Sequence, residues 1–216
     1  MPLNKSKGQM YPWVTHTWNT VKGKCPHDCS YCYMKRYPQP ELHFDEKSLS
    51  NGLGDENIIF VGSSCDMWAE SIPFEWIDKT LRHCRAFGSK FLFQSKNPLR
   101  FNGWRFPDNT MLGCTIESNR VYLDISKAPE PLSRKSMMAQ FHLPKMISIE
   151  PVMDFDLIDM VRWIKEIKPE FVSIGADSGN NHLPEPSPDK VKSLIASLQE
   201  ITEVKVKDNL SRLLRL

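Results

Sequence analysis

Three cysteines lie close together near the start of this 216-residue chain, in the segment KGKCPHDCSYCYM. They are Cys25, Cys29 and Cys32, with the spacing Cys-x3-Cys-x2-Cys. Thiolates are soft ligands that suit zinc ions and iron–sulfur clusters. The other cysteines of the chain are isolated from one another, so no second pair completes a four-thiol site. The spacing predicts a metal centre with three thiolate ligands.

Two kinds of metal centre are compatible with three thiolates. A structural zinc ion needs four protein ligands, and His16, His27 or His43 would supply the fourth. A four-iron cluster needs a ligand for each iron. If the protein supplies three, the fourth iron is open to a small molecule. Three thiols therefore favour an iron–sulfur cluster with one open position, and zinc is the alternative.

Short apolar segments alternate with longer amphipathic ones along the chain. Strands are predicted at residues 13–18, 57–62, 90–95, 110–117, 145–151 and 170–175. Helices are predicted at residues 73–88, 132–142, 155–167 and 187–201. The last helix has the clearest start, because Ser187 can cap it and Pro188 suits its first turn.

This alternation predicts an α/β fold with parallel strands and right-handed crossovers. Near-continuous apolar strands indicate a sheet that is covered on both faces. The pattern allows a barrel, a partial barrel or a doubly wound sheet, and about six units are too few for a closed eight-stranded barrel. No linker or low-complexity segment divides the chain, so we expect one domain over residues 1–216.

Polar segments follow each predicted strand. They read CPHDC, GSSCD, SKN, TIESN, IEP and GADSG in chain order. The carboxyl ends of parallel strands form the active site in α/β proteins. We therefore expect these segments to meet at one edge of the sheet, with the three cysteines among them.

Composition limits the class of protein. The mean hydropathy is −0.42, and no apolar run is long enough for a membrane-spanning helix. The first residues, MPLNKSKGQMYPWV, contain no apolar stretch of the kind found in secretory signals. We therefore expect a cytoplasmic protein with no membrane partner. Thiols stay reduced there, so its cysteines are better interpreted as ligands than as disulfides.

The charges are unevenly distributed, although the formal net charge is only +2. Residues 41–78 are mainly acidic, whereas residues 79–107 contain seven basic residues, several aromatic residues and no carboxylate. Basic and aromatic side chains together are typical of nucleic-acid binding. The alternative interpretation is that the aromatics are buried in a strand and the charges cover a solvated helix.

The cysteine spacing, placed after a first strand in a chain of repeated βα units, resembles the radical S-adenosylmethionine (SAM) superfamily. The resemblance implies a partial (βα)6 barrel with a 4Fe–4S cluster on the three cysteines and SAM on the fourth iron. It also implies reductive cleavage of SAM to a 5′-deoxyadenosyl radical that abstracts hydrogen from a substrate. An electron donor such as flavodoxin or ferredoxin is then the expected partner.

A narrower resemblance concerns the order of THTWNTVKGKC, QSKNP, TIESN, ISIEPV and VSIGADSG. These segments are similar to those of a phage-associated radical SAM family of unassigned function. The chain differs from that family in its three-residue first cysteine spacing and in Asp177, where a glutamate is usual. From the phage association and the basic segment, we expect a nucleotide or nucleic-acid substrate.

The superfamily resemblance also implies residues that contact SAM. An aromatic residue before the third cysteine packs near the adenine, and strand ends supply the other contacts. The implied residues are Tyr31, Gly62, Ser63, Ser64, Asp66, Lys96, Thr115, Glu117, Ser118 and Glu150. Structural roles are the alternatives: a Gly-Ser turn with an aspartate helix cap, a solvated lysine and a paired glutamate.

Three functional hypotheses follow. The first is a radical SAM enzyme acting on an unknown substrate. The second is a zinc-stabilised module that binds nucleic acid without catalysis. The third is a radical SAM fold that has lost catalysis and serves as a scaffold.

Overall fold

The computed structural model describes residues 3–8 and 10–214. Its main feature is one eight-stranded sheet, with the strand order β1-β2-β5-β6-β7-β8-β9-β10. The strands are β1 (Asn4–Lys5), β2 (His16–Trp18), β5 (Ile58–Val61), β6 (Lys90–Ser95), β7 (Thr110–Thr115), β8 (Lys145–Ile149), β9 (Phe171–Ile174) and β10 (Glu203–Val206). All neighbouring strands are parallel except β1, which pairs antiparallel with β2.

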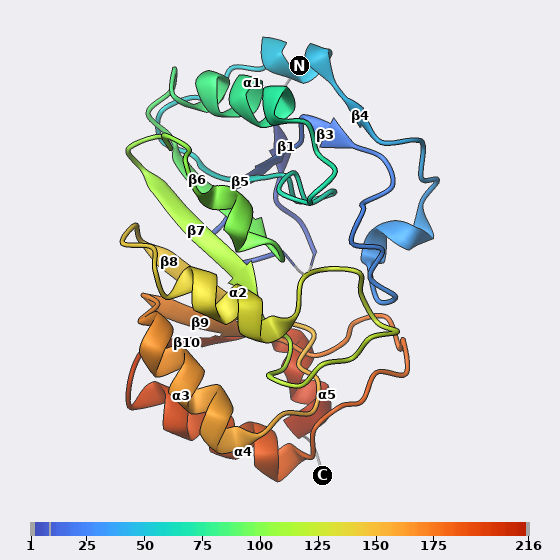
Figure 1. Cartoon of the computed structure of the whole chain (residues 1–216), viewed down its shortest axis with the longest axis vertical. Helices are drawn as coiled ribbons and strands as arrows, with labels where there is room; N and C mark the ends of the chain where they lie inside the picture. Colours follow the sequence, from blue (N-terminus) through green and yellow to red (C-terminus); the bar gives the residue numbers. More distant parts are fainter. Residues whose placement is uncertain (1–2, 9, 215–216) are drawn as a thin grey trace.

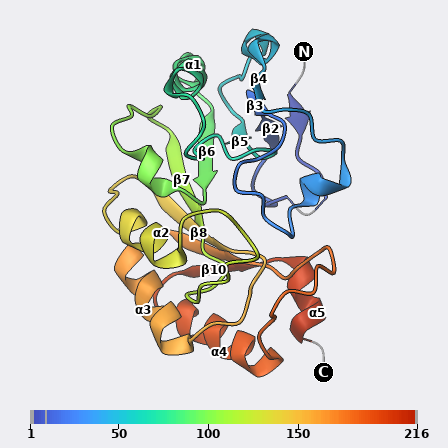
Figure 2. The same ribbon diagram turned by 45° about the vertical axis from the view of Figure 1, so that its right-hand side comes forward.

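The helices lie on one side of this curved sheet (Figures 1 and 2). They are α1 (Phe74–Cys84), α2 (Pro131–Met138), α3 (Leu157–Ile167), α4 (Pro188–Gln199) and the short α5 (Ser211–Leu214). The sheet ends at β1 on one side and at β10 on the other, so the barrel is partial and open. The predicted α/β fold is confirmed.

All six predicted strands and all four predicted long helices are present. Two helix ends were predicted too late. Helix α1 ends at Cys84 and not at residue 88, because the chain turns at Arg85–Phe87 before β6. Helix α2 ends at Met138 and not at residue 142, where turns replace its last predicted residues. Helix α4 begins as predicted, with Ser187 accepting a hydrogen bond from the Lys190 backbone.

Several shorter elements were not predicted, among them the edge strand β1 and the short helix α5. The antiparallel pair β3 (Val21–Lys22) and β4 (His43–Phe44) flanks the cysteine segment, and β10 forms an edge of the main sheet. Short 3₁₀ helices occupy Tyr33–Arg36, Glu46–Ser50, Pro98–Phe101 and Asp208–Leu210.

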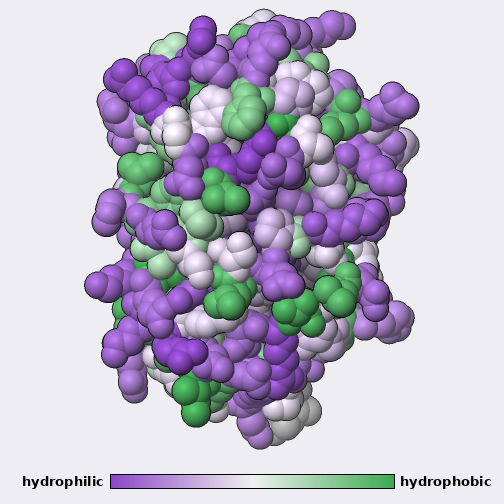
Figure 3. All heavy atoms as spheres, in the orientation of Figure 1, coloured by the Kyte–Doolittle hydropathy of each residue, from purple (hydrophilic) through white to green (hydrophobic). Residues whose placement is uncertain are grey.

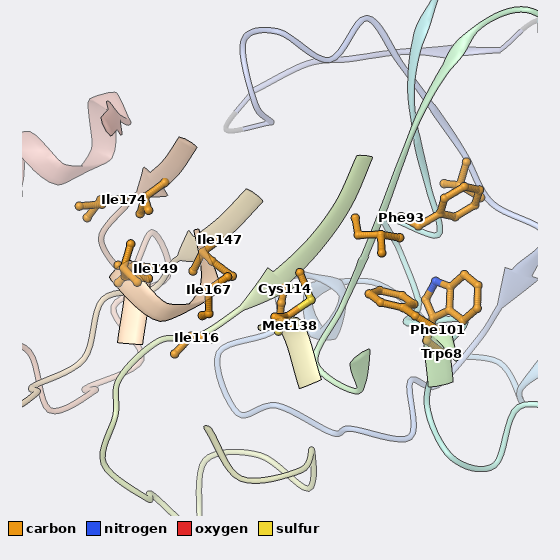
Figure 4. Packing of buried hydrophobic residues seen from close by; sticks show 14 of the residues in the cluster. Trp68, Phe93, Phe101, Cys114, Ile116, Met138, Ile147, Ile149, Ile167 and Ile174 are labelled. Carbon is orange, nitrogen blue, oxygen red and sulfur yellow. The ribbon is translucent and has the colours of Figure 1, made fainter. Parts of the chain in front are cut away.

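Side chains alternate across the sheet, as a pleated strand requires. On β6, Phe91 and Phe93 belong to the large core beneath the helices, whereas Leu92 and Gln94 point to the opposite, concave face. Figure 4 shows the core side, where Phe93 lies close to Trp68 and Phe101. The outward face is therefore apolar, and the concave face is left for a cavity.

The amino-terminal segment covers the concave face near the amino ends of the parallel strands. Tyr11 stacks on Trp13 at 5.4 Å between ring centroids, and Trp13 meets the edge of Phe171 at 5.3 Å. Leu92 and Met146 complete this second, smaller apolar cluster. Both faces of the sheet are thus covered there, as its apolar strands predict.

The outer surface is mainly polar. Figure 3 shows hydrophilic side chains over most of one face, with apolar residues scattered between them. None of the helices in the described part of the chain is long and apolar enough to cross a membrane.

Candidate functional site

A cavity of about 640 Å³ lies on the concave face at the carboxyl ends of the parallel strands. Its size is within the range of small-molecule sites. All three clustered cysteines line it, together with residues that follow β5, β6, β8 and β9. The prediction that polar strand ends meet at one edge of the sheet agrees with this arrangement.

The three thiols are suitable ligands. Cys25, Cys29 and Cys32 are free, with Cys29 buried and the other two half-buried. A hydrogen bond from the Cys65 thiol lowers the pKa of Cys25 to about 6. Thiolate is the form that binds metals. The donor set therefore fits a cluster that takes three protein thiolates.

Two of the histidines that were considered for a zinc site make contacts within the protein. Within residues 3–8 and 10–214, no three His, Cys, Asp or Glu side chains are grouped to hold one metal ion. The Nε2 atom of His27 pairs with Asp66 Oδ2 at 2.8 Å, and His43 Nδ1 contacts the Glu41 carbonyl. In a four-iron cluster the three thiolates surround one cluster, and each binds a different iron.

Asp66 ties the cysteine loop to the sheet. Its Oδ2 atom lies 2.8 Å from His27 Nε2 and accepts hydrogen bonds of 2.9 Å from the Ser95 hydroxyl and the Lys96 backbone. Its Oδ1 atom accepts from the Trp68 backbone at 2.9 Å. Burial raises the pKa of Asp66, but His27 and the backbone donors outweigh burial and lower it. The carboxylate is thus committed to contacts within the protein.

The segment between β7 and α2 holds the cysteine loop from its other side. The Ser30 backbone donates to the Ile125 carbonyl at 2.8 Å, and the Lys127 backbone donates to the His27 carbonyl at 2.8 Å. Between these bonds, Ser126 Oγ lies 3.2 Å from Cys29 Sγ. A thiolate can only accept, so the Ser126 hydroxyl is the donor when Cys29 is ionised.

Glu117 is at the centre of a buried charged group. Its carboxylate accepts a hydrogen bond from the Tyr31 hydroxyl, pairs with Arg134 Nη1 at 2.7 Å and lies 3.4 Å from Lys96 Nζ. Burial raises the pKa of Glu117, but Lys96, Arg134 and Tyr31 together lower it to about 2. The Lys96 ammonium also lies 5.3 Å from the centre of the Tyr31 ring.

Most of the residues that sequence reasoning assigned to SAM line the cavity. They are Tyr31, Gly62, Ser63, Ser64, Asp66, Lys96, Thr115 and Glu150. Glu117 and Ser118 are buried outside the lining. Ser118 Oγ donates to the Asp154 carbonyl at 2.5 Å and accepts from the Arg120 backbone. Glu117 is thus paired with a cation, as its structural alternative expects, and Ser118 binds backbone groups.

The turn after β5 needs a glycine. Gly62 has a φ of +80°, a conformation that side chains with a Cβ rarely adopt. The Ser64 backbone donates to the Asn19 side chain at 3.0 Å, which links this turn to the end of β2. The alternative of a Gly-Ser turn therefore fits Gly62–Ser64, and the residues still line the cavity.

The opposite wall is formed by β8, β9 and β10. Glu150 accepts from Lys207 Nζ at 2.8 Å and from Asn209 at 3.2 Å. A Cβ at Gly175 would lie 2.7 Å from the Glu150 carboxyl group, so glycine makes room for that side chain. Tyr11 supports the floor of the cavity through its hydroxyl, which lies 2.9 Å from both Gln94 Oε1 and Ser148 Oγ.

Sequence reasoning missed several of these partners. These partners are far from the cysteines in sequence: Arg134 lies on α2, Ser126 in the loop before it, and Lys207 directly after the edge strand β10. No local pattern distinguishes them from solvated residues. Only the topology, which brings β7–α2 and β10 to the same edge, places them at the site.

The sequence matches no family model and none of the curated proteins compared with it. Solved structures do resemble the fold. A mutant of spore photoproduct lyase aligns with a TM-score of 0.63 at 10% identity, over 92% of this chain and 78% of the lyase chain. SuiB from Streptococcus suis, bound to precursor peptide SuiA, aligns with a TM-score of 0.61 at 9% identity, over 91% of this chain and 49% of SuiB.

Both proteins are radical SAM enzymes. The chain shares their fold. A further structure with this radical SAM fold is a lyase mutant with bound AdoMet and dinucleoside spore photoproduct, which aligns with a TM-score of 0.54 at 10% identity. It is covered over 66% of its length, against 93% of this chain. At these identities the likeness concerns the fold.

The contacts of the basic segment 79–107 agree with the structural alternative, and its binding of nucleic acid stays a prediction. Phe91, Phe93 and Phe101 are buried in the core beneath the helices. Lys79 pairs with Glu46 and Glu75. The other guanidinium and ammonium groups mostly bind nearby carboxylates or carbonyls, as Arg82 does with Asp78. The alternative interpretation, with buried aromatics and a charged outer helix, is the one that fits.

Proposed function

We propose that the protein is a radical SAM enzyme that binds a 4Fe–4S cluster and SAM in this cavity. The observation that carries the proposal is the set of three free thiols on the cavity wall, at the carboxyl ends of the strands of a partial barrel. When bound, the cluster would supply the electron that cleaves SAM to methionine and a 5′-deoxyadenosyl radical. A flavodoxin or ferredoxin would deliver that electron in the cytoplasm.

The protein's own residues would bind and orient SAM. The Tyr31 ring and the Lys96 ammonium line the cavity beside the cysteine loop, for the adenine and the carboxylate respectively. The turn Gly62–Ser64, Thr115 and Glu150 supply polar atoms at the neighbouring strand ends.

Glu117 and Ser118 are buried outside the cavity lining, so we treat their predicted contacts with SAM separately. Glu117 would act through the two groups it holds, Tyr31 and Lys96. A direct contact of Ser118 with SAM stays a prediction. Membership of the phage-associated radical SAM family is part of the same proposal, and it is supported by the order of the sequence motifs.

Anaerobic reconstitution with iron and sulfide tests this function. The wild-type protein should become brown, bleach with dithionite and convert SAM to 5′-deoxyadenosine. Cys29→Ala should lose iron and product, whereas Cys84→Ala, which alters a buried thiol on α1 away from the cavity, should keep both. A colourless zinc protein would contradict the proposal. A brown protein that binds SAM but yields no 5′-deoxyadenosine would indicate a scaffold without catalysis.

A further inference from the structure

The charges that line the cavity are unequal. Five cationic side chains and three carboxylates belong to the lining. Each carboxylate already has partners in the protein: Asp66 holds His27, Glu150 holds Lys207, and Asp177 accepts hydrogen bonds from Gly179 and Asn181. Two of the five cations are paired with carboxylates, Lys207 with Glu150 and Lys96 with the adjacent Glu117.

The other three cations of the cavity lining are exposed to solvent. Lys5 and Lys7 are exposed on and beside the edge strand β1, and Arg36 is exposed at the end of the 3₁₀ helix Tyr33–Arg36. None of the ion pairs between described residues includes these three. A cavity mouth with one sign of charge attracts ligands of the opposite sign.

Arg36 reaches across the mouth. A Cβ at Gly179 would lie 3.0 Å from Arg36 Nη2, so the guanidinium group approaches the loop that follows β9. Figure 1 shows the cysteine segment in blue and this loop in orange on the same side of the sheet. Arg36 thus lies between the cysteine segment and the loop after β9, where a ligand could contact it.

Two exposed tyrosines belong to the same short segment as Arg36. Tyr33 and Tyr37 line the cavity, and their side chains are 50% and 59% exposed. The Tyr33 hydroxyl donates to the Ser63 carbonyl at 3.1 Å, which ties the ring to the turn after β5. Exposed aromatic faces beside basic groups are the arrangement on which nucleobases stack.

We infer that the cavity binds a nucleotide where Arg36 approaches the loop after β9, with its phosphate at Arg36 and its base against Tyr33 or Tyr37. This inference rests on the proposed function, because the nucleotide would be the substrate presented to the same cavity. An acidic peptide would satisfy the cations but not the two exposed rings. A nucleotide uses both, and it is either free or part of a single strand.

Equilibrium binding tests the inference with the anaerobically reconstituted full chain. The probes are thymidine monophosphate, a short fluorescent oligothymidylate and a fluorescent oligoglutamate of similar length. Tyr33→Ala should weaken nucleotide binding by roughly tenfold. Arg36→Ala should weaken oligothymidylate binding and reduce the slope of log K against log salt by about 0.7.

The matched controls lie on α1, away from the cavity. Phe74 is an aromatic residue that is 65% exposed, and the Arg82 side chain is 72% exposed. Phe74→Ala and Arg82→Ala should leave nucleotide affinity and salt dependence unchanged. Binding of the monophosphate would indicate a free nucleotide, and binding of the oligothymidylate alone would indicate a strand; either result supports the inference.

Two results would overturn the inference. The first is binding of oligoglutamate with no binding of either nucleotide probe. The second is nucleotide binding that Tyr33→Ala and Arg36→Ala do not weaken relative to the two controls. Formation of 5′-deoxyadenosine by the wild-type protein is measured separately. Product without nucleotide binding would reject only this inference, and nucleotide binding without product would reject the proposed enzyme.

Discussion

Glu117 keeps a negative charge in a position that is only 3% exposed, because three side chains surround its carboxylate. Arg134 and Lys96 provide opposite charge, and the Tyr31 hydroxyl donates a hydrogen bond. Removing one member of a buried charged group leaves the others without compensation. The residue therefore fixes a ring and an ammonium group that both face the cavity.

Glu117→Gln should reduce stability in a pH-dependent way. The pKa of Glu117 falls from 4.5 to about 2 on folding, so its ionised form stabilises the protein above pH 4.5. That contribution, on the order of 3 kcal/mol, is lost as the pH falls from 4.5 toward 2. Urea unfolding of the cofactor-free chain should show a large difference between wild type and variant at pH 7 that narrows at pH 3.

Glu56→Gln provides the control, because Glu56 is exposed and far from this group in sequence. Its stability should match that of the wild type at both pH values. A difference for Glu117→Gln that is equally large at pH 3 and pH 7 would contradict the role given to its charge.

At this scale, sequence reasoning worked best where spacing alone restricts the chemistry. The positions of Cys25, Cys29 and Cys32 at the cavity follow from their spacing and from the strand that precedes them. The assignment of Glu117 as a direct ligand contact ignored Arg134, which only the fold brings near. Asp66 was likewise assigned to SAM, although four donors within the protein already surround it.

Among the elements, the segment between β7 and α2 has the clearest effect on the cysteine loop. It forms two backbone hydrogen bonds to that loop and brings the Ser126 hydroxyl to Cys29. Hydrogen bonds to cluster ligands influence the reduction potential of the cluster. An ordinary loop residue can therefore affect how readily the site accepts an electron.

Ser126→Ala should make the midpoint potential of the reconstituted cluster more negative, because one hydrogen bond to the Cys29 thiolate is lost. A redox titration followed by electron paramagnetic resonance measures the shift. Ser30→Ala is the control, since Ser30 is exposed in the same loop and no thiol lies among its hydrogen-bond partners within the described residues. Equal potentials in both variants would show that the Ser126 contact has no electronic effect.

Strand–helix alternation was readable from the sequence because six strands and four helices carry clear apolar patterns. Strand β10 was missed because its sequence, EVKV, alternates charged residues at a sheet edge. Strands β1, β3 and β4 have two residues each, too few for a period to be visible. Their roles depend on pairing with distant segments and not on local preference.

For the whole molecule, the large core is mostly separate from the three clustered cysteines. It extends from Trp18 to Leu213 under the helices, and of the three clustered cysteines only Cys25 packs against it. Small zinc domains unfold without metal because they lack such a core. Here the sheet and its helices have enough buried apolar surface to fold without the cluster.

Removal of iron with a chelator should therefore abolish the visible absorption but leave the far-ultraviolet circular dichroism spectrum nearly unchanged. Thermal unfolding should stay cooperative, with a modest decrease in midpoint because a bound ligand stabilises the folded state. Unfolding of the chain on loss of iron would instead indicate that the metal centre is structural, as in the zinc hypothesis.

The stack of Tyr11 on Trp13 bears on how ligands reach and leave the cavity. The stack belongs to an apolar cluster with Leu92, Met146 and Phe171 on the concave face, below the polar residues at the strand ends. A ligand bound in the outer part of the cavity would cover one bound deeper. In the proposed reaction, a substrate bound nearer to solvent than SAM would then leave before the products of SAM cleavage.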